Sequence, residues 1–332
     1  MLSIIRTIAQ ELNVRPGQVE AAVGLLDGGA TVPFIARYRK EVTEGLDDTQ
    51  LRNLEERLAY LREMEERRAA ILKSIEEQGK LTPELKTQIV EADTKARLED
   101  LYLPYKPRRV TKGMLAREAG IEPLADALLA DPTLVPDTEA QKFLNAEKNY
   151  ADSKAVLDGA KHILMERFAE NADLLEKLRT FMTDNAEVVA KVVAGKENEG
   201  AKFRDYFEHR EPLKAVPSHR ALAMFRGRNE GVLTLALEMP GQEEATAAGQ
   251  PHPAEGMIAG FAGIRNEKRA ADAWLQEVVR WTWRVKLLTH LETDLLGDIK
   301  GSAEEEAIKV FADNLKDLLM AAPAGPRATL GL

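Results

Sequence analysis

Cysteine is absent from the 332-residue sequence, which rules out disulfides, thiolate catalysis and every zinc site built on sulfur. Aromatic residues make up only 5%, a share that fits aliphatic helix packing better than a β-sandwich. No apolar run approaches the roughly 18 to 20 residues of a membrane span. Arg6, Gln10 and Glu11 interrupt the apolar positions at the start, so no signal-peptide core forms. The sequence therefore predicts a cytoplasmic protein that makes no contact with a membrane.

Acidic residues exceed basic ones, 55 against 46, and the net charge of −9 speaks against a surface that is basic throughout. Two acid-free segments depart from this average. The first, Tyr105 to Gly113, carries four cations: Lys106, Arg108, Arg109 and Lys112. The second, Ala215 to Asn229, carries three arginines: Arg220, Arg226 and Arg228. These seven residues are the candidate nucleic-acid-binding residues.

Signatures of catalysis and of cofactor binding are missing. Gly195-Lys196 is followed by Glu197, without the upstream glycine of a phosphate-binding loop. The five histidines form neither a His-Glu-x-x-His nor a His-x-His pair, so no metal site is indicated. Ser218-His219 lacks the neighbouring glycines of a nucleophile elbow. We therefore expect a protein that is not an enzyme, with no catalytic residue, metal or cofactor of its own.

Helical patterns dominate the sequence. Proline and glycine punctuation predicts three short N-terminal helices, over 3–12, from Pro16 to Gly28-Gly29, and over 34–40. The last is basic, which leaves two interpretations open: a DNA-reading helix-turn-helix or, more commonly, plain three-helix packing. A long helix is predicted from Asp47 to Gln78, although Glu65 and Arg68 interrupt its apolar seam.

Beyond the long helix, the two prolines of segment 102–109 predict an exposed irregular loop. Further helices are predicted over 122–130, 151–181, 270–296 and 303–322. Residues 196–231 are predicted to be irregular, 232–237 to form a hairpin or edge strand, and 239–253 to form a flexible loop. In segment 225–231, a turn before the strand explains the glycines better than a nucleotide-binding loop does.

The predicted fold class is mainly α. It is an elongated multi-helix assembly with a long central helix, a helix-turn-helix-like N-terminal bundle and a small β-hairpin or edge strand. Four parts are expected: a helical bundle over 1–45, the long helix and basic loop over 46–131, a helical domain over 132–322 with its β element near 232–238, and a linker and strand over 323–332.

The first basic segment admits two interpretations. Tyr102 and Tyr105 interleave with the cations, a combination that neutralises phosphates and stacks on unpaired bases. Alternatively, the loop is simply solvated and its tyrosines fold back on neighbouring helices. For the second segment a structural role is favoured more strongly than for the first, because Leu222, Met224 and Phe225 need burial.

Several long segments together resemble the bacterial Tex family of transcription accessory proteins. They cover essentially the whole sequence and are the following: TVPFIARYRKE at 31–41, LDD at 46–48, LEDLYLPYK at 98–106, EGAKFRDYF at 199–207, PSHRAL at 217–222 and FRGRNEG at 225–231. Signatures of this length are far more specific than any three-residue motif.

The resemblance implies a protein of transcription and RNA metabolism, distantly related to a eukaryotic transcription-elongation and histone-chaperone factor. Full-length members add an RNase H-like domain, helix-hairpin-helix elements and an RNA-binding OB-fold. Residues 328–332 resemble the first strand of that RNase H-like domain, so the sequence is expected to stop at its beginning, before the acidic residue of a nuclease.

The leading hypothesis is a non-catalytic helical scaffold that binds nucleic acid, RNA more readily than DNA, and contacts the transcription machinery. The alternative is a purely protein-binding structural module in which the cations are solvated. Salt-dependent binding of RNA or DNA that falls when the basic loop is mutated separates the two.

Overall fold

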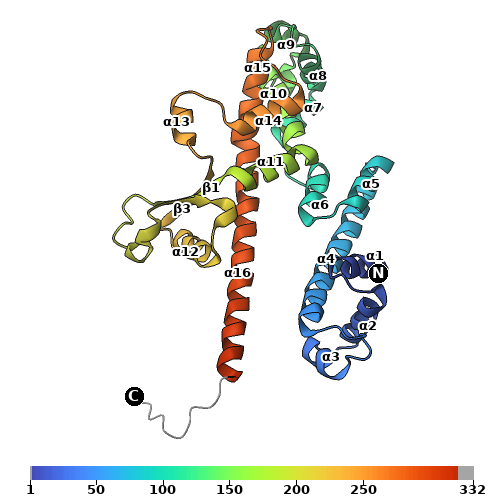
Figure 1. The fold of residues 1–332 in the computed structure, drawn as a ribbon. Helices are drawn as coiled ribbons and strands as arrows, with labels where there is room; N and C mark the ends of the chain where they lie inside the picture. Colours follow the sequence, from blue (N-terminus) through green and yellow to red (C-terminus); the bar gives the residue numbers. More distant parts are fainter. Residues whose placement is uncertain (1, 321–332) are drawn as a thin grey trace. The chain divides into compact units, whose positions relative to one another are not determined.

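The computed structural model describes residues 2–320 of the protein. The polypeptide divides into two compact units, Met1–Pro107 and Arg108–Leu332. The predicted mainly α fold is confirmed, with one small antiparallel sheet in the second unit (Figure 1). The linker and strand predicted for 323–332 lie outside the described residues, and the four-part domain division stays a prediction.

Six α-helices and one 3₁₀ helix build the first unit: α1 Leu2–Glu11, α2 Pro16–Asp27, α3 Val32–Tyr38, α4 Asp48–Glu77, α5 Pro83–Glu91, α6 Lys95–Tyr102 and η1 Leu103–Tyr105. The three predicted N-terminal helices are thus confirmed. They pack on the first half of α4 through fully buried aliphatic side chains such as Ile8, Ile35 and Leu51. This core closes without any aromatic side chain.

Helix α4 begins at a reciprocal cap: Asp47 accepts the Gln50 N–H at 2.7 Å, and Gln50 accepts the Asp47 N–H at 3.1 Å. The predicted long helix is therefore confirmed. The interruption of its seam at Arg68 also has a physical reason. The Arg68 guanidinium donates to the Ile89 carbonyl at 3.0 Å and to the Ala92 carbonyl at 2.7 Å, so it satisfies carbonyls at the end of α5.

The second unit has ten α-helices and three strands among its described residues. They are α7 Lys112–Glu118, α8 Glu122–Ala130, α9 Pro136–Ala140, α10 Ser153–Ala169, α11 Ala172–Asn185, β1 Glu187–Val192, β2 Glu208–Pro212, α12 Ser218–Asn229, β3 Leu233–Glu238, α13 Gln242–Ala247, α14 Pro253–Ala262, α15 Asp272–Trp281 and α16 Leu288–Met320. Short 3₁₀ helices lie at 141–143, 146–148, 201–206 and 213–215, and a π-helix, η6 Thr282–Leu287, joins α15 to α16. Buried α10 is the centre of the packing in this unit.

The sheet has the order β2-β1-β3, with both pairs antiparallel. Val189 of β1 lies opposite Arg210 of β2 on one side and Ala236 of β3 on the other. The predicted edge strand is β3, and this prediction is confirmed. The expectation of irregular structure over 196–231 is wrong, because β2 and α12 lie there; residues 225–229 are helical, and the turn before β3 is confined to 230–232.

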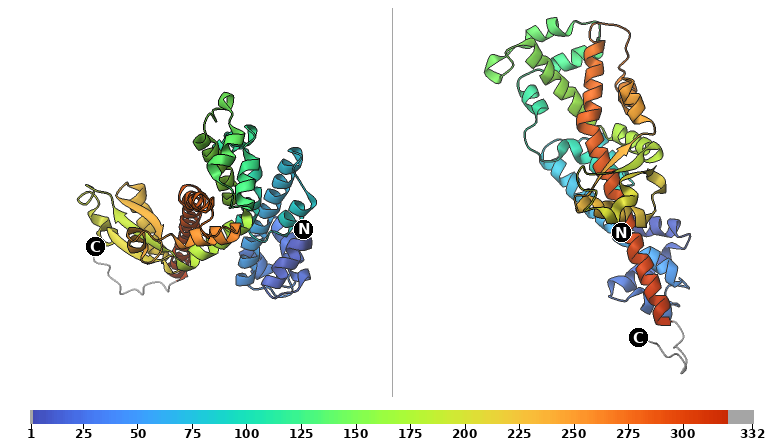
Figure 2. Two further views of the ribbon diagram at one scale, coloured as in Figure 1. Left: turned by 90° about the horizontal axis from the view of Figure 1, so that it is seen from above. Right: turned by 90° about the vertical axis from the view of Figure 1, so that its left-hand side faces the viewer.

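Two helices predicted over 270–296 and 303–322 are instead one continuous run of α15, η6 and α16 (Figures 1 and 2). Gly297 and Gly301 do not break it, since a glycine costs a helix interior only about 1 kcal/mol. The flexible loop predicted over 239–253 is also partly wrong, because α13 forms within it.

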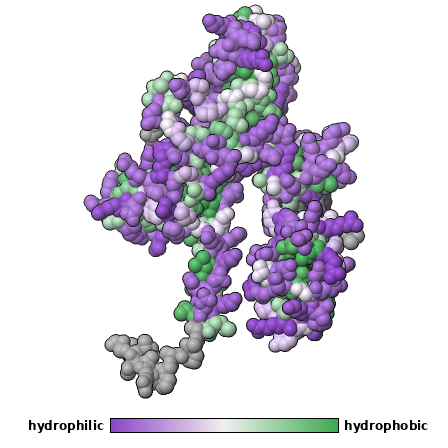
Figure 3. Space-filling model, viewed as in Figure 1, coloured by the Kyte–Doolittle hydropathy of each residue, from purple (hydrophilic) through white to green (hydrophobic). Residues whose placement is uncertain are grey.

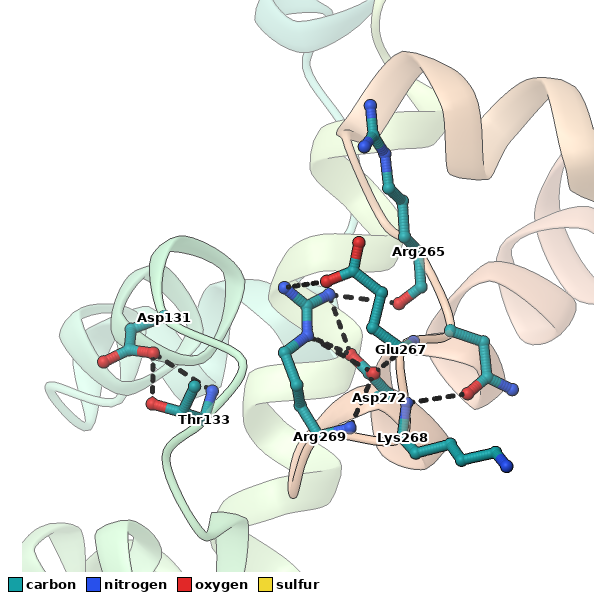
Figure 4. A network of polar contacts seen from close by, with 8 residues as sticks. Asp131, Thr133, Arg265, Glu267, Lys268, Arg269 and Asp272 are labelled. Atoms are coloured by element: carbon teal, nitrogen blue, oxygen red, sulfur yellow. Dashed lines mark hydrogen bonds and ion pairs between the residues drawn. The ribbon is translucent and has the colours of Figure 1, made fainter.

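The start of this long helical run is held by a polar network (Figure 4). Asp272 is 1% exposed and accepts backbone N–H groups from Glu267 at 2.7 Å and Arg269 at 2.9 Å. The Arg269 guanidinium lies 3.0 Å from the same carboxylate. Burial alone would raise the pKa of Asp272, but the hydrogen bonds from Arg269 and Glu267 lower it below the ordinary value of 3.8.

A depressed pKa in the folded state means that ionised Asp272 stabilises the fold above pH about 4, and that this contribution is lost as the pH falls further. We expect Asp272→Asn to lower the melting temperature at pH 7 and to lower it less at pH 3. Circular dichroism melts across this pH range measure both. Exposed Asp313 gives the control, Asp313→Asn. If Asp272→Asn lowered the melting temperature equally at both pH values, the result would contradict a lowered pKa of Asp272 in the folded protein.

Candidate nucleic-acid interface

The four cations of the first basic segment, Lys106, Arg108, Arg109 and Lys112, are all exposed. The backbone is irregular only over 106–111, between η1 and α7. The exposed irregular loop predicted over 102–109 is therefore partly wrong, because buried Tyr102 ends α6 and residues 103–105 form η1. Thr111 then caps α7, its hydroxyl accepting the Met114 N–H at 3.1 Å. The boundary between the two units falls within the segment, so Lys106 belongs to the first unit and the other three cations to the second.

Pairing separates these cations into two kinds. Arg108 forms an ion pair with Glu170 at the end of α10, and this hydrogen bond raises the pKa of Arg108 above its ordinary value. Lys106, Arg109 and Lys112 have no ion-pair partner among the side chains of residues 3–320 that the structure describes. These three charges are therefore available to a ligand, whereas that of Arg108 is largely offset.

Tyr102 does not provide the stacking surface proposed for it. Its side chain is 7% exposed, and its hydroxyl lies 3.0 Å from the Ser74 hydroxyl. The Arg67 guanidinium lies over the ring at 5.3 Å from its centroid. Tyr102 thus folds back on α4, and that part of the base-stacking hypothesis is wrong. Tyr105 is partly exposed, and its carbonyl accepts a hydrogen bond from Gln78 at 2.9 Å.

Lys286 of η6, which the sequence patterns did not identify, acts together with Lys112 on the charge of His162. Burial, followed by the charges of Lys112 and Lys161, lowers the pKa of His162 on α10, and Lys286 of η6 acts in the same direction. Lys161 is neutralised by Asp158 and Glu277, each at 2.9 Å. Lys286 is far from Lys112 in sequence, so only the fold brings their charges to one histidine.

The second basic segment is mostly neutralised. Arg220 pairs with Glu211 of β2 at 3.1 Å, and Arg226 pairs with Glu230 at 3.1 Å. Arg228 lies over the Phe225 ring, 4.9 Å from its centroid. Met224 and Phe225 are buried, as expected, at 1% and 4% exposure, whereas Leu222, also expected to be buried, is only half-buried. Helix α12 is therefore chiefly a packing element that presents Arg228, and its role in binding stays a prediction.

Helix α3 presents an exposed aromatic pair that the sequence patterns also missed. Phe34 is 40% exposed and Tyr38 is 62% exposed, with ring centroids 5.4 Å apart. Arg39 lies over the Phe34 ring at 5.3 Å, and Arg37 is exposed on the same short helix. The DNA-reading role suggested for this bundle stays a prediction.

Two absences hold within residues 2–320. No three or more His, Cys, Asp or Glu side chains are grouped so that they could hold a metal ion. No described helix has both the length and the apolarity that crossing a bilayer requires.

The fold and these surfaces define a mainly α protein whose candidate site is a set of exposed cations. Two family models match: "Tex-like protein N-terminal domain" over residues 2–76 and "Tex central region-like" over residues 131–311. The chain belongs to the Tex family, and the resemblance found in its sequence is confirmed.

Relatives align over nearly the whole chain. It is 61% identical to Protein YhgF of Escherichia coli K12 over 330 residues, covering 99% of the chain and 42% of YhgF. It is 55% identical to Transcriptional accessory protein Tex of Neisseria gonorrhoeae, covering 100% of the chain and 43% of Tex. Human S1 RNA-binding domain-containing protein 1 is 25% identical over 99% of the chain and 33% of its own length. The chain thus spans about two fifths of its bacterial relatives.

Proposed function

We propose that this chain is a non-catalytic helical scaffold of a Tex-family protein that acts in transcription and binds nucleic acid, RNA in preference to DNA. The observation that carries this proposal is a short segment of an acidic protein in which three exposed cations, Lys106, Arg109 and Lys112, have no ion-pair partner among the described side chains. The names of two relatives, Transcriptional accessory protein Tex and S1 RNA-binding domain-containing protein 1, support the two parts of the proposal, transcription and RNA. Contact with the transcription machinery is part of the same proposal.

Phosphate contacts explain why the unpaired cations matter most. A cation that already has an acidic partner gains little from a phosphate, because it must give up that partner. A cation that is only hydrated releases condensed counterions from the nucleic acid instead. Lys106, Arg109 and Lys112 are therefore expected to contribute more to binding than Arg108, Arg220 or Arg226.

Fluorescence anisotropy with single-stranded RNA and duplex DNA across a salt series tests the proposal. We expect the RNA to bind more tightly, and Lys106→Ala/Arg109→Ala/Lys112→Ala to weaken binding. Three lost contacts, each contributing about 0.7 for a single strand, reduce the slope of log K against log salt by roughly 2.

A matched control removes three other charges. Lys142, Lys196 and Lys300 each pair with a nearby glutamate, so Lys142→Ala/Lys196→Ala/Lys300→Ala is expected to retain binding. Equal losses in the two triple variants would show a net-charge effect and contradict the site. Metal-dependent cleavage of either probe would contradict the non-catalytic part of the proposal.

One observation favours the alternative, a purely protein-binding module. The far half of α16 exposes an apolar face, visible as green patches in Figure 3. Ile308 is 69% exposed, Phe311 68% and Leu318 75%. Exposed apolar surface of this kind is typical of protein contacts. Absence of salt-dependent binding to both nucleic acids would leave this module as the better account.

A further inference from the structure

A cavity of about 290 Å³ lies in the second unit where α13, the start of α14 and the π-helix η6 meet. Its lining includes apolar residues such as Pro240, Pro251 and Leu288. The charged groups come from Glu255 and Arg284, and the other polar side chains are those of His252, Gln242, Thr246 and Gln250. Its position on a π-helix is notable, because single-turn π-helices occur frequently at functional sites. None of the candidate phosphate-binding residues lines it.

Glu255 lines this cavity, and its carboxylate carries a buried hydrogen-bond acceptor that is not satisfied within residues 2–320. The residue is 6% exposed, and its Oε1 has no hydrogen-bond partner among the described atoms. It is the third residue of α14, from which a glutamate usually accepts the N–H of the capping residue. Here the structure gives Glu255 no such bond; instead the capping residue, His252, accepts the Ala254 N–H at 3.1 Å. The Arg284 Nε lies 3.8 Å from Oε1, beyond hydrogen-bond distance.

His252 supplies a neutral aromatic surface beside this acceptor. Burial lowers the pKa of His252 to about 4, so the ring is uncharged at neutral pH. Its Nδ1 accepts a hydrogen bond, which leaves the proton on Nε2. The ring stacks on Trp283 with centroids 4.5 Å apart and an interplanar angle of 24°. Trp283 is 2% exposed, so packing fixes the orientation of the whole stack.

The charges of the cavity restrict its ligand. The Glu255 carboxylate disfavours an anion, while the nearby Arg284 guanidinium disfavours a cation. A neutral planar group that presents N–H donors to Glu255 and a carbonyl or ring nitrogen to Arg284 satisfies both residues. Nucleobases have this pattern and also stack on aromatic side chains such as His252, which is partly exposed and held in place by buried Trp283. Guanine fits best, because its N1–H and N2–H lie beside its O6 acceptor.

We propose that this cavity binds a single unpaired nucleobase, preferentially guanine, through Glu255, Arg284 and the His252–Trp283 stack. The base is supplied either as a free nucleoside or nucleotide or as one residue of a single strand. The inference goes beyond the proposed function, because it adds base recognition at a place separate from the phosphate-binding cations.

Isothermal titration calorimetry with guanosine, adenosine, cytidine and uridine tests the base pocket, since these neutral probes remove any phosphate contribution. We expect guanosine to bind most tightly and uridine least. Glu255→Gln should weaken guanosine binding at least tenfold, because an amide replaces the acceptor that receives the N–H groups. The control Glu305→Gln, at an exposed position of α16, should bind as the unmodified protein does.

Arg284→Leu provides a second variant if Glu255→Gln fails to fold, since the Arg284 side chain is 58% exposed and its loss is tolerated more easily. Weaker guanosine binding by this variant supports the pocket. Equal affinity for all four nucleosides, no binding of guanosine, or unchanged binding in both variants would overturn it. Binding of arginine amide without guanosine would also overturn it, by showing a site for cations.

Oligouridine strands with and without one central guanosine distinguish the two sources of the base. Tighter binding of the guanosine-containing strand, abolished by Glu255→Gln, assigns the pocket to a strand; binding of guanosine without this difference assigns it to a free nucleoside. The triple variant Lys106→Ala/Arg109→Ala/Lys112→Ala should still bind guanosine. If strands bind with salt sensitivity but guanosine does not bind, the base pocket is rejected and the proposed function is retained. If guanosine binds but no strand does, the proposed function is rejected and the base pocket is retained.

Discussion

Replacing Glu166 with alanine is expected to destabilise the second unit by about 3 kcal/mol, the lower end of the range for breaking a buried ion pair. Glu166 of α10 is 2% exposed and accepts a hydrogen bond from the Arg117 guanidinium at 3.1 Å. The lower end applies because the Arg117 side chain is 31% exposed and also reaches Glu122 at 3.3 Å. Urea unfolding followed by circular dichroism measures the loss.

The matched control for this prediction is Glu122→Ala. Glu122 contacts the same arginine at 3.3 Å and Arg167 at 3.2 Å, but its side chain is 42% exposed. Exposed pairs contribute about 1 kcal/mol or less, so the control should unfold close to the midpoint of the unmodified protein. A control that lost as much stability as Glu166→Ala would show that burial of the carboxylate is not the cause.

Local rules were sufficient for the parts of the fold that depend on sequence neighbours. The cap at Asp47 and the proline at Pro16 each set a helix boundary that the structure confirms. Such signals act within a few residues through backbone hydrogen bonds and fixed φ angles, so no knowledge of tertiary contacts is needed.

Elements that depend on distant partners could not be predicted in the same way. Strand β2 has the sequence EHREP, whose charged side chains give no apolar alternation, and it exists because β1 pairs with it. Helix α12 has many charges, yet it buries Phe225 and Gly227, and Gly227 lies close to Leu233 of β3. In both cases tertiary packing overrides the weak local preference.

The candidate site also combines features set by sequence neighbours with features set by distant residues. Neighbouring Arg108 and Arg109 are equivalent as sequence, and only the fold shows that Arg108 meets Glu170, 62 residues away, while Arg109 has no ion-pair partner within the described part of the chain. Tyr102 likewise matched the pattern of a stacking residue until Arg67 and Ser74 were found against it. Composition located the basic segment, but the availability of each side chain was decided by residues far along the chain.

Gly227→Ala is expected to destabilise the second unit by about 1–3 kcal/mol, the usual cost of overpacking a closed core. A Cβ at Gly227 of α12 would lie 2.5 Å from Leu233 Cδ1 and 2.8 Å from its Cγ. Leu233 is 2% exposed in β3, so it has little room to move away. The better helix propensity of alanine, about 1 kcal/mol, offsets only part of this cost.

Gly260→Ala is the control that separates packing from propensity. Gly260 lies inside α14, and nothing approaches within 4 Å of a Cβ added there. This variant should gain up to about 1 kcal/mol, since only the propensity changes. If Gly227→Ala gained stability as well, α12 would not pack against β3 as closely as the structure shows.

A double-mutant cycle then isolates the contact itself. Leu233→Ala removes the atoms that a Cβ at Gly227 would strike, at a cost of about 2–5 kcal/mol for the cavity. Because the added methyl group partly fills that cavity, the double variant should be more stable than the sum of the two single effects predicts, by at least about 0.5 kcal/mol. Strictly additive effects would show that the two residues do not meet, and that the close approach of α12 to β3 is not what requires a glycine at position 227.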